Sequence, residues 1–469
     1  MVCKGSSIEA RFDMWRERFT VSVEKSLEIR DAFYGELEKG LAIHKQEPTA
    51  DYDRSKCSLY MLDCCVDKLP NGSERGVYYA VDLGGTNLRA VRVELKGKGE
   101  YDMAQVKDNI RNDQVTEALP KGLLDKNATA TQLFDGITER VIRLREEQKD
   151  PKDRFIPVGM TFSFGIKQLR LDSAVLLGWS KEFETGMNST DPVIGQDVCR
   201  LLTEAFRRNG TNCATVASLN DTTGTMLAAC YEKPRKAPPC MMGMILGTGF
   251  NICYVDDMAP EFGYDGRVVN IESGNFNLCL PRTSVDLEVD FESGCMGAQQ
   301  NEKMISGLYI CEIIRYLLLR VFQKQAPDEA WTKNSLPTDA CAKVFNDDSV
   351  GYVVTKGVMK QHWDWEVADE GHLRIIYKLI SAVFQRSAVL AAICVAAIAK
   401  KTRRLQPAMG GLTLGVDGSL FCMNPKYQKH LQKHLRKMLG DDLAGLIHFT
   451  ITSDGSGKGA AVMACAAVK

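Results

Sequence analysis

An acidic residue stands in a glycine turn within the stretch Tyr78–Val93, YYAVDLGGTNLRAVRV. An apolar run ends at Asp82, two glycines, a threonine and an asparagine follow, and apolar and basic residues then alternate, which predicts strand, tight turn and strand. Backbone N–H groups of such a turn can surround a phosphate, because glycine has no Cβ. Asp82 would then need a divalent cation between itself and the phosphate, and Mg²⁺ suits that position because it uses few carboxylates. The alternative is an ordinary hairpin whose Asp82 caps the turn, and the turn alone leaves both open.

A second turn, in Gly243–Val255, repeats this pattern with the letters GMILGTGFNICYV. A duplicated strand-turn-strand unit indicates two related domains that face each other, so that their turns could hold a polyphosphate from both sides. Helical and strand patterns alternate along the chain, which predicts the α/β class. The segment Leu412–Phe421, LTLGVDGSLF, predicts a third strand-turn-strand with Asp417 and Ser419 in its turn.

The loop Asp454–Gly459, DGSGKG, is superficially similar to a Walker A phosphate loop. Its first glycine is missing and Gly459 stands where serine or threonine should follow the lysine, so we reject that motif. The loop does precede the apolar sequence AAVMACAA, and the N-terminus of that predicted helix would favour an anion.

Asn220 and Asp221 follow an apolar strand pattern and open a helical one. A carboxylate at the carboxyl end of a strand lies where α/β sheets usually bind ligands. These residue types are equally typical of a helix N-cap, which the two positions alone favour. Further polar residues beside apolar strands could supply the hydrogen bonds that a sugar needs, although each alone is explained as a surface or capping residue: Ser163, Ser180, Lys181, Asn251, Glu272 and Glu288.

Composition excludes several other classes. A chain of 469 residues is long enough for two or three domains, and its net charge of -1 gives no global field for nucleic acid or an anionic membrane. The 16 cysteines form no CxxC pair and the six histidines form no metal motif, so we expect buried free thiols in a reducing compartment. We find no signal-peptide core, and the longest apolar stretch, Ala388–Ala399, predicts a buried helix. We therefore expect a cytoplasmic protein without a membrane anchor.

Taken together, the motifs resemble those of the eukaryotic-type hexokinases. The segments DLGGTNLR, VGMTFSFG, LGWSKEF, NDTTGTM, LGTGFNICY, NIESGNF, LGVDGSLF and SDGSGKGAA occur in the order of that family, from about Tyr78 to the end of the chain. Several independent segments coincide, which makes the resemblance far more specific than any single motif. The length is similar to that of the single-unit members rather than the duplicated mammalian forms.

The resemblance implies the actin-like ATPase fold, in which two ribonuclease-H-like lobes enclose a cleft. It places the small lobe at residues 67–218, with residues 455–469 as its last helix. The large lobe then comprises residues 1–66 and 219–454. The family binds its sugar deep in the cleft, and the lobes close over it.

The same resemblance assigns roles to individual positions. Asp221 corresponds to the catalytic base, and Lys181 to the lysine of the family's Thr-Lys pair. The implied sugar ligands are Ser163, Ser180, Lys181, Asn220, Asp221, Asn251, Glu272 and Glu288. The implied nucleotide ligands are Asp82 beside Mg²⁺, contacting it through water, Gly84, Gly85, Thr86 and Asn87 in the first phosphate turn, Thr248 and Gly249 in the second, and Asp417, Gly418, Ser419, Gly455 and Ser456 on the adenosine side.

The implied reaction is the first step of glycolysis, in which ATP and a hexose give hexose 6-phosphate and ADP. The ligands suit glucose, with mannose, fructose and glucosamine as further candidates, and the oligomeric state stays open between monomer and homodimer. Two alternatives share the fold: a glucose sensor with weak catalysis, and an ATPase that works without a hexose. The sugar-side residues favour the kinase, since the fold alone does not separate these functions.

Three positions depart from the family pattern. Gly165 stands where proline usually follows TFSF, Ser180 replaces a threonine, and Phe250 replaces a threonine in the second phosphate turn. The first change would loosen the sugar loop, the second keeps the hydroxyl, and the third removes a hydroxyl that could contact phosphate. The third change therefore bears on the preference for the phosphoryl donor rather than on the reaction itself.

Overall fold

Two β-sheets built on one plan form the centre of the protein. The computed structural model describes residues 7–46, 56–84, 87–109, 121–179, 183–232 and 236–468. One sheet has the strand order β4-β3-β2-β5-β8 and the other β1-β11-β10-β9-β12-β13. In each sheet an antiparallel hairpin, β2–β3 or β9–β10, is followed by two parallel strands, β5 and β8 or β12 and β13. This equivalence confirms the α/β class and the duplicated hairpin.

The strand bounds are as follows. The five-stranded sheet contains β2 (Arg75–Leu83), β3 (Asn87–Gly97), β4 (Glu100–Asn109), β5 (Ile156–Phe162) and β8 (Cys213–Leu219). The six-stranded sheet contains β1 (Leu62–Asp63), β9 (Cys240–Leu246), β10 (Phe250–Val255), β11 (Val268–Asn270), β12 (Leu412–Asp417) and β13 (Ile447–Ile451). A separate hairpin pairs β6 (Gly165–Arg170) with β7 (Ser173–Gly178).

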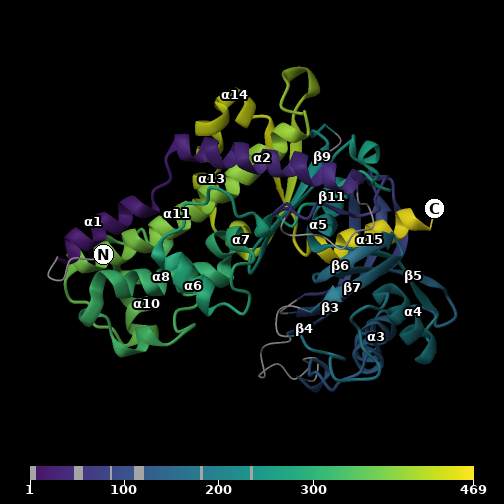
Figure 1. The fold of residues 1–469 in the computed structure, drawn as a ribbon. Helices are drawn as coiled ribbons and strands as arrows, with labels where there is room; N and C mark the ends of the chain where they lie inside the picture. The colour runs from purple at the N-terminus through teal and green to yellow at the C-terminus, as the bar shows by residue number, and fades with distance from the viewer. Residues whose placement is uncertain are drawn as a thin grey trace.

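Helices cover these sheets and form the rest of the molecule (Figure 1). Those next to the five-stranded sheet are α3 (Ala130–Glu147), α4 (Val198–Arg208) and α15 (Gly455–Ala467), while α5 (Asp221–Glu232) packs mainly on β9 and β12 of the six-stranded sheet. The others are α1 (Ile8–Phe19), α2 (Val23–Gln46), α6 (Ser284–Glu292), α7 (Gln300–Ile305), α8 (Gly307–Phe322), α9 (Thr338–Phe345), α10 (Val353–Trp363), α11 (Glu370–Lys401), α12 (Ser419–Cys422), α13 (Pro425–Leu439) and α14 (Asp441–Ala444).

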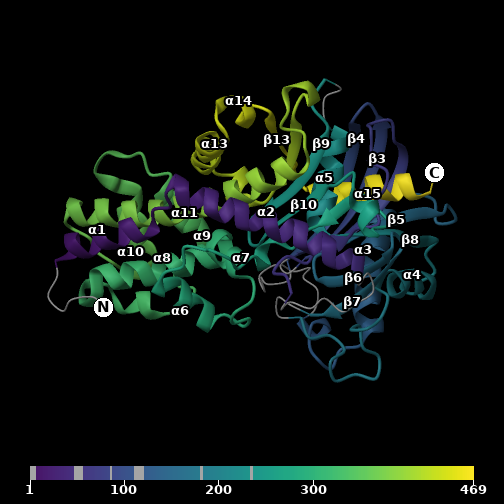
Figure 2. The same ribbon diagram turned by 45° about the horizontal axis from the view of Figure 1, so that its top comes forward.

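Helix α11 is the centre of the helical part and contacts α1, α2, α8, α9 and α13 (Figure 2). By length and composition alone it could cross a bilayer, but 83% of its most apolar window is buried inside the fold. It is therefore a core helix, as the apolar run Ala388–Ala399 predicted.

Helices α5 and α15 cross in close contact between the two sheets. A Cβ added to Gly459 would lie 1.8 Å from the carbonyl oxygen of Gly224, so only glycine fits at the crossing. Lys458 is buried and donates to Glu232 at 2.5 Å and to the hydroxyl of Tyr101 at 3.1 Å. The glycines and lysine of this loop therefore serve helix packing, in keeping with the rejection of a Walker A loop.

One predicted element is wrong. Residues after Gly418 form helix α12 rather than the second strand of a hairpin. Gly418 has φ 112°, a region that favours glycine, and α13 already begins at Pro425. The residues between these two positions form α12 instead.

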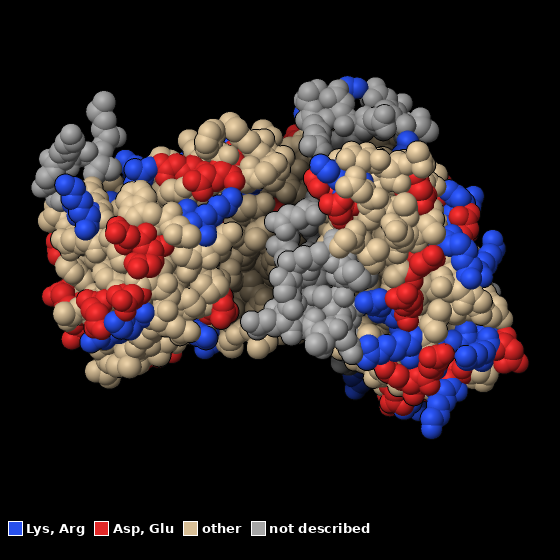
Figure 3. Space-filling model, turned by 90° about the horizontal axis from the view of Figure 1, so that it is seen from below, with Lys and Arg blue, Asp and Glu red and all other residues tan. Residues whose placement is uncertain are grey.

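The molecule is hollowed between two masses on the face shown in Figure 3. The helices α1, α8 and α10 lie at one end of the molecule and β3, β4, α3 and α4 at the other (Figure 1). The five-stranded sheet takes its strands from residues 75–219, and α15 contacts β2 and β5 of this sheet. The division into lobes at residues 67, 218 and 455 stays a prediction.

Candidate active site

A chain of amide and carboxylate side chains lies at the ends of β8, β10 and β11. We call Asn220, Asp221, Asn251, Asn270 and Glu272 the amide cluster. The Nδ2 of Asn251 donates to Asn270 Oδ1 at 2.8 Å and approaches Asn220 Oδ1 at 3.5 Å. The Nδ2 of Asn270 donates to Glu272 Oε1 at 2.8 Å. These bonds fix the orientation of each amide, so the cluster is organised by its own side chains.

The structure confirms the helix-cap interpretation of Asn220, while the ligand role of the Asn220–Asp221 pair stays a prediction. Asn220 caps α5, because its Oδ1 accepts from the backbone N–H of Thr222 at 3.0 Å and from the Thr222 hydroxyl at 2.6 Å. Asp221 Oδ1 accepts from the same N–H at 2.9 Å, while its Oδ2 accepts from the hydroxyl of Ser163 at 3.1 Å. Ser163 follows β5 and its N–H donates to Leu83 at the end of β2. Asp221 thus meets the loop that leaves the five-stranded sheet.

The backbone at Glu272 is held in the left-handed region, with φ 54° and ψ 51°. A residue with a side chain adopts this conformation at a cost, and such positions are frequent at functional sites. Ser273 follows, and its N–H donates to Asn251 Oδ1 at 3.1 Å. The turn therefore sets the Glu272 carboxylate beside the two asparagines.

The structure does not bring Glu288 to this cluster. Glu288 lies on α6, where its Oε1 accepts from Arg320 of α8 and its Oε2 has no hydrogen-bond partner among the described residues. A different acid, Glu302 on α7, accepts from the N–H of Phe250 at 2.8 Å, directly before Asn251. Its neighbour Asn301 donates to the carbonyl of Ser273 at 3.1 Å. Geometry therefore favours Glu302 over Glu288 as the second acid of the site.

A second group of charged residues joins the carboxyl ends of β2 and β12 to the start of α15. We call Asp82, Asp417 and Asp454, together with Arg89, the aspartate cluster. Asp82 is buried and accepts from the hydroxyl of Thr161 at 2.8 Å and from that of Ser456 at 2.9 Å. Arg89, which the motif analysis left without a role, lies 3.4 Å from Asp82 Oδ2 and also pairs with Asp454. One guanidinium thus links two carboxylates that are far apart in the sequence.

Asp417 connects two backbone turns through its carboxylate. It accepts from the N–H of Gly418 at 2.7 Å and from that of Gly455, the first residue of α15, at 2.9 Å. Burial raises the pKa of Asp417, and these two N–H groups and Arg89 only partly offset the effect. Ser419 opens α12 directly after this turn. The predicted adenosine-side residues therefore lie together.

The second phosphate turn lies beside these residues. A Cβ on Gly247 would lie 3.1 Å from Gly418 Cα, and one on Gly249 would lie 3.0 Å from Glu302 Oε2. Thr248 is exposed, and its carbonyl accepts from Leu308 at 3.2 Å. The turn Gly247–Gly249 thus lies between Glu302 and Gly418, and its role as a phosphate turn stays a prediction.

Some predicted residues lie outside the described residues. They are Gly85 and Thr86 of the first phosphate turn, and Ser180 and Lys181 of the sugar loop. On either side, Gly84 follows β2 and Asn87 begins β3. The roles assigned to these positions stay predictions.

Comparison with known proteins identifies the family. Residues 11–231 and residues 241–466 each match a hexokinase profile. The chain belongs to the hexokinase family. A hexokinase from Plasmodium falciparum is 40% identical over 97% of this chain and 91% of its own length. The activity of the present chain is therefore the ATP-dependent phosphorylation of a hexose, a reaction of glycolysis.

Solved hexokinases share the whole fold. A hexokinase crystal structure superposes with a TM-score of 0.89 at 38% identity, covering 98% of this chain and 99% of that one. A hexokinase from Schistosoma mansoni in complex with glucose gives 0.82 at 30% identity, covering 98% and 100%. These matches confirm the actin-like, two-lobed architecture.

The structure shows the surroundings of Gly165 and Phe250, two departures from the hexokinase pattern. No atom outside the adjacent residues lies within 4 Å of a Cβ built on Gly165, so the missing proline leaves open space. Phe164, just before it, packs against Trp179 at 5.0 Å and Phe183 at 4.8 Å between ring centroids. Phe250 is buried, so it presents no side chain to a phosphate. The aromatic packing around Phe164 thus supports the loop that contains Gly165.

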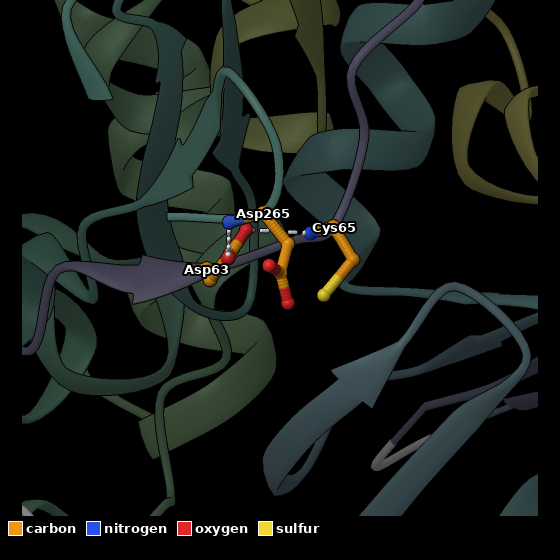
Figure 4. Close-up of side chains that lie close together, drawn as sticks. All are labelled: Asp63, Cys65 and Asp265. Carbon is orange, nitrogen blue, oxygen red and sulfur yellow. Dashed lines mark hydrogen bonds between the residues drawn. The ribbon is translucent and has the colours of Figure 1, made fainter. Parts of the chain in front are cut away.

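A third cluster has donors that could suit a metal ion but is explained without one. Among the described residues, Asp63, Cys65 and Asp265 bring three potential ligand atoms together (Figure 4). The Asp63 carboxylate accepts from the N–H of Cys65 at 2.7 Å and from that of Asp265 at 2.6 Å. Both of its oxygens are therefore used to join β1 to the loop before β11.

Proposed function

We propose that the hexose is D-glucose and that its 6-hydroxyl attacks the γ-phosphate of Mg-ATP, with Asp221 as the base. The observation that carries this proposal is the position of Asp221: its carboxylate accepts from the Ser163 hydroxyl at 3.1 Å, and the adjacent Asn220 lies 3.5 Å from Asn251 Nδ2. A glucose molecule offers several hydroxyls, each able to donate and accept, and amide and carboxylate groups pair with both kinds. The glucose complex of the Schistosoma mansoni hexokinase supports this choice of sugar.

Asp221 acts mainly by orientation. An aspartate with a reference pKa of about 3.9 is a weak base for an alcohol, so it accepts the proton only as the O–P bond forms. Before that step its carboxylate holds the 6-hydroxyl in line with the phosphate, which is where phosphoryl transfer gains most. Closure of the lobes would exclude water, which would otherwise compete as acceptor.

The remaining sugar ligands in this proposal are Asn220, Asn251, Glu272 and Glu302. Glu302 replaces Glu288 in this set, because its carboxylate accepts from the N–H of Phe250, next to Asn251. In this proposal, the opposite lobe would contact the sugar through Ser163, Ser180 and Lys181. We further propose that mannose, fructose or glucosamine is accepted only where its hydroxyls keep these bonds.

The aspartate cluster suits Mg-ATP. Asp82 Oδ1 accepts one hydroxyl and retains a second lone pair, so a metal-bound water can be accepted there, while Oδ2 faces both Ser456 and Arg89. Mg²⁺ would neutralise the charge of the transferred phosphoryl group. Arg89 already lies beside Asp82, and backbone N–H groups of the glycine turns would hold the phosphates.

The test is formation of hexose 6-phosphate. Purified protein is incubated with ATP, Mg²⁺ and each of the four sugars, and the product is measured with a dehydrogenase that is specific for its phosphate ester. We expect glucose to give the highest kcat/KM. Product from another sugar but none from glucose would contradict the sugar assignment.

We also propose a cytoplasmic location. Every cysteine in the described part of the chain is a free thiol, and most are buried, which suits a reducing compartment. Fluorescence microscopy of the tagged full-length chain in its source cell tests this. A signal confined to a membrane-bound compartment would contradict it.

A further inference from the structure

Helix α7 carries Glu302 but has little stability of its own. It spans the six residues Gln300–Ile305, too few for an isolated helix to persist. Its N-cap, Gln299, has φ 51° and makes no capping hydrogen bond with its side chain. The position of α7, and so of Glu302, must therefore be set by contacts with other elements.

Three consecutive residues of α7 contact three different elements. Asn301 donates to Ser273, and Glu302 accepts from Phe250 at the start of β10. Lys303 points to the other side, where its Nζ donates to Asp290 Oδ1 at 2.5 Å and to the carbonyl of Cys295 at 2.7 Å. The first two contacts lie within the site, whereas Lys303 ties α7 to α6 outside it. Helix α7 is also joined to α11, where Asn301 lies 3.5 Å from Cys394 Sγ and the Ser387 hydroxyl donates to the carbonyl of Ile305 at 2.6 Å.

The Lys303–Asp290 pair is largely buried and shares its carboxylate with a backbone N–H group. The side chain of Lys303 is 4% exposed and that of Asp290 is 15% exposed. The two oxygens of Asp290 also accept from the N–H of Gly297, at 3.0 and 3.1 Å. One carboxylate at the end of α6 thus holds the loop 293–299 and the lysine of α7 together. A buried ammonium is costly unless paired in this way, which restricts α7 to one position.

We propose that Lys303 and Asp290 are positioning residues, which fix α7 so that the Glu302 carboxylate faces the sugar hydroxyls. This rests on the proposed function, in which Glu302 is a sugar ligand. Neither residue contacts the aspartate cluster among the described contacts, so their effect falls on the sugar rather than on ATP.

Lys303→Met tests this role. Methionine keeps most of the apolar stem and removes the charge, and the Asp290 carboxylate that remains is partly exposed and keeps its bonds to Gly297. We expect KM for glucose to rise on the order of tenfold or more, as for other displaced substrate ligands, with KM for ATP changed by less than about twofold. The matched control is Lys360→Met, which breaks an exposed pair with Asp364 and Glu366 and should leave both constants unchanged. Calorimetric titration with glucose, without nucleotide, provides a second readout.

A double-mutant cycle separates positioning from general destabilisation. If Lys303 acts through Glu302, Lys303→Met should change KM for glucose by less than about twofold in a Glu302→Gln background. Equal effects in both backgrounds, or equal losses for glucose and ATP, would overturn the proposal. If Lys303→Met does not fold, the neutral pair Asp290→Asn with Lys303→Met replaces it in the same cycle.

Failure of the proposed function would look different. A wild-type protein that neither binds nor phosphorylates glucose would refute the sugar assignment, and this inference with it. A wild-type protein that phosphorylates glucose, with an unchanged KM in the Lys303→Met variant, would refute the positioning role alone.

Discussion

The amide cluster and the aspartate cluster are held together by different forces. In the amide cluster, amide side chains bond to one another and to a carboxylate, as from Asn251 to Asn270 and from Asn270 to Glu272, both at 2.8 Å, and so fix donors and acceptors in a pattern. In the aspartate cluster, carboxylates bond to hydroxyls, to Arg89 and to backbone N–H groups, as in Asp417. On the proposed function, side chains select the sugar, whereas backbone turns and charge hold the nucleotide. Changes of side chain should therefore affect mainly the sugar, and an added Cβ in a turn mainly ATP.

The largest effect is expected at the residue that meets both substrates. Asp221→Asn keeps the bond from Ser163 but removes the charge that orients and accepts the proton, so kcat should fall by about 10²- to 10⁴-fold. Glucose binding, measured by calorimetry, should remain. Turnover near the wild-type rate would exclude Asp221 as the base.

The two candidate acids give a matched pair. Glu302→Gln should raise KM for glucose by about ten- to a hundredfold, the loss expected for a hydrogen bond to a charged group. Glu288→Gln removes only the contact between α6 and Arg320 of α8 and should change KM by less than about twofold. The reverse order would restore the assignment made from the sequence.

An added methyl group tests the nucleotide side. A Cβ on Gly418 would lie 2.5 Å from the carbonyl of Leu246, at a residue with φ 112°, so Gly418→Ala must displace the turn beside Asp417. We expect KM for ATP to rise several-fold, with glucose binding retained. Gly440→Ala is the control, because Gly440 also has a positive φ, 80°, but open space around it, and should cost only about 1 kcal/mol of stability. Weaker glucose binding in the Gly418→Ala variant with an unchanged KM for ATP would reverse the comparison.

The smallest effect concerns pH and a residue far from both clusters. Burial lowers the pKa of His434 to about 4, and its ring contacts the hydroxyl of Ser26 at 2.8 Å. The folded state therefore binds fewer protons than the unfolded state between pH 4 and the ordinary value of 6.5. The contribution of His434 to the free energy of unfolding is fully present above pH 6.5. It is lost as the pH falls below that value, by on the order of 2 kcal/mol.

His434→Gln should flatten this decline in thermal unfolding, without changing the pH dependence of kcat/KM. An equally steep decline in the variant would show that other groups cause it. A shift in the activity profile would mean that the two clusters are coupled to this helix.

The local patterns were readable from the sequence and the distant partners were not. Glycine turns are short-range signals, so Asp82 and the two hairpins were found from them. Arg89 pairs with Asp454, which lies 365 positions away in the sequence, and no local pattern predicts a pair between such distant residues. Glu302 lies on a helix too short to show periodicity. Glu288 was chosen because it stands among apolar residues, but on α6 it faces Arg320 of α8.

The direct test of the account is the rate of ADP release from Mg-ATP, measured with and without D-glucose. We predict rapid release only when glucose and Mg²⁺ are both present, and almost none in the Asp221→Asn variant. Release that is equally rapid without glucose would make the protein an ATPase and contradict the assignment of the amide cluster to the sugar. Glucose binding without any release would instead make it a sensor.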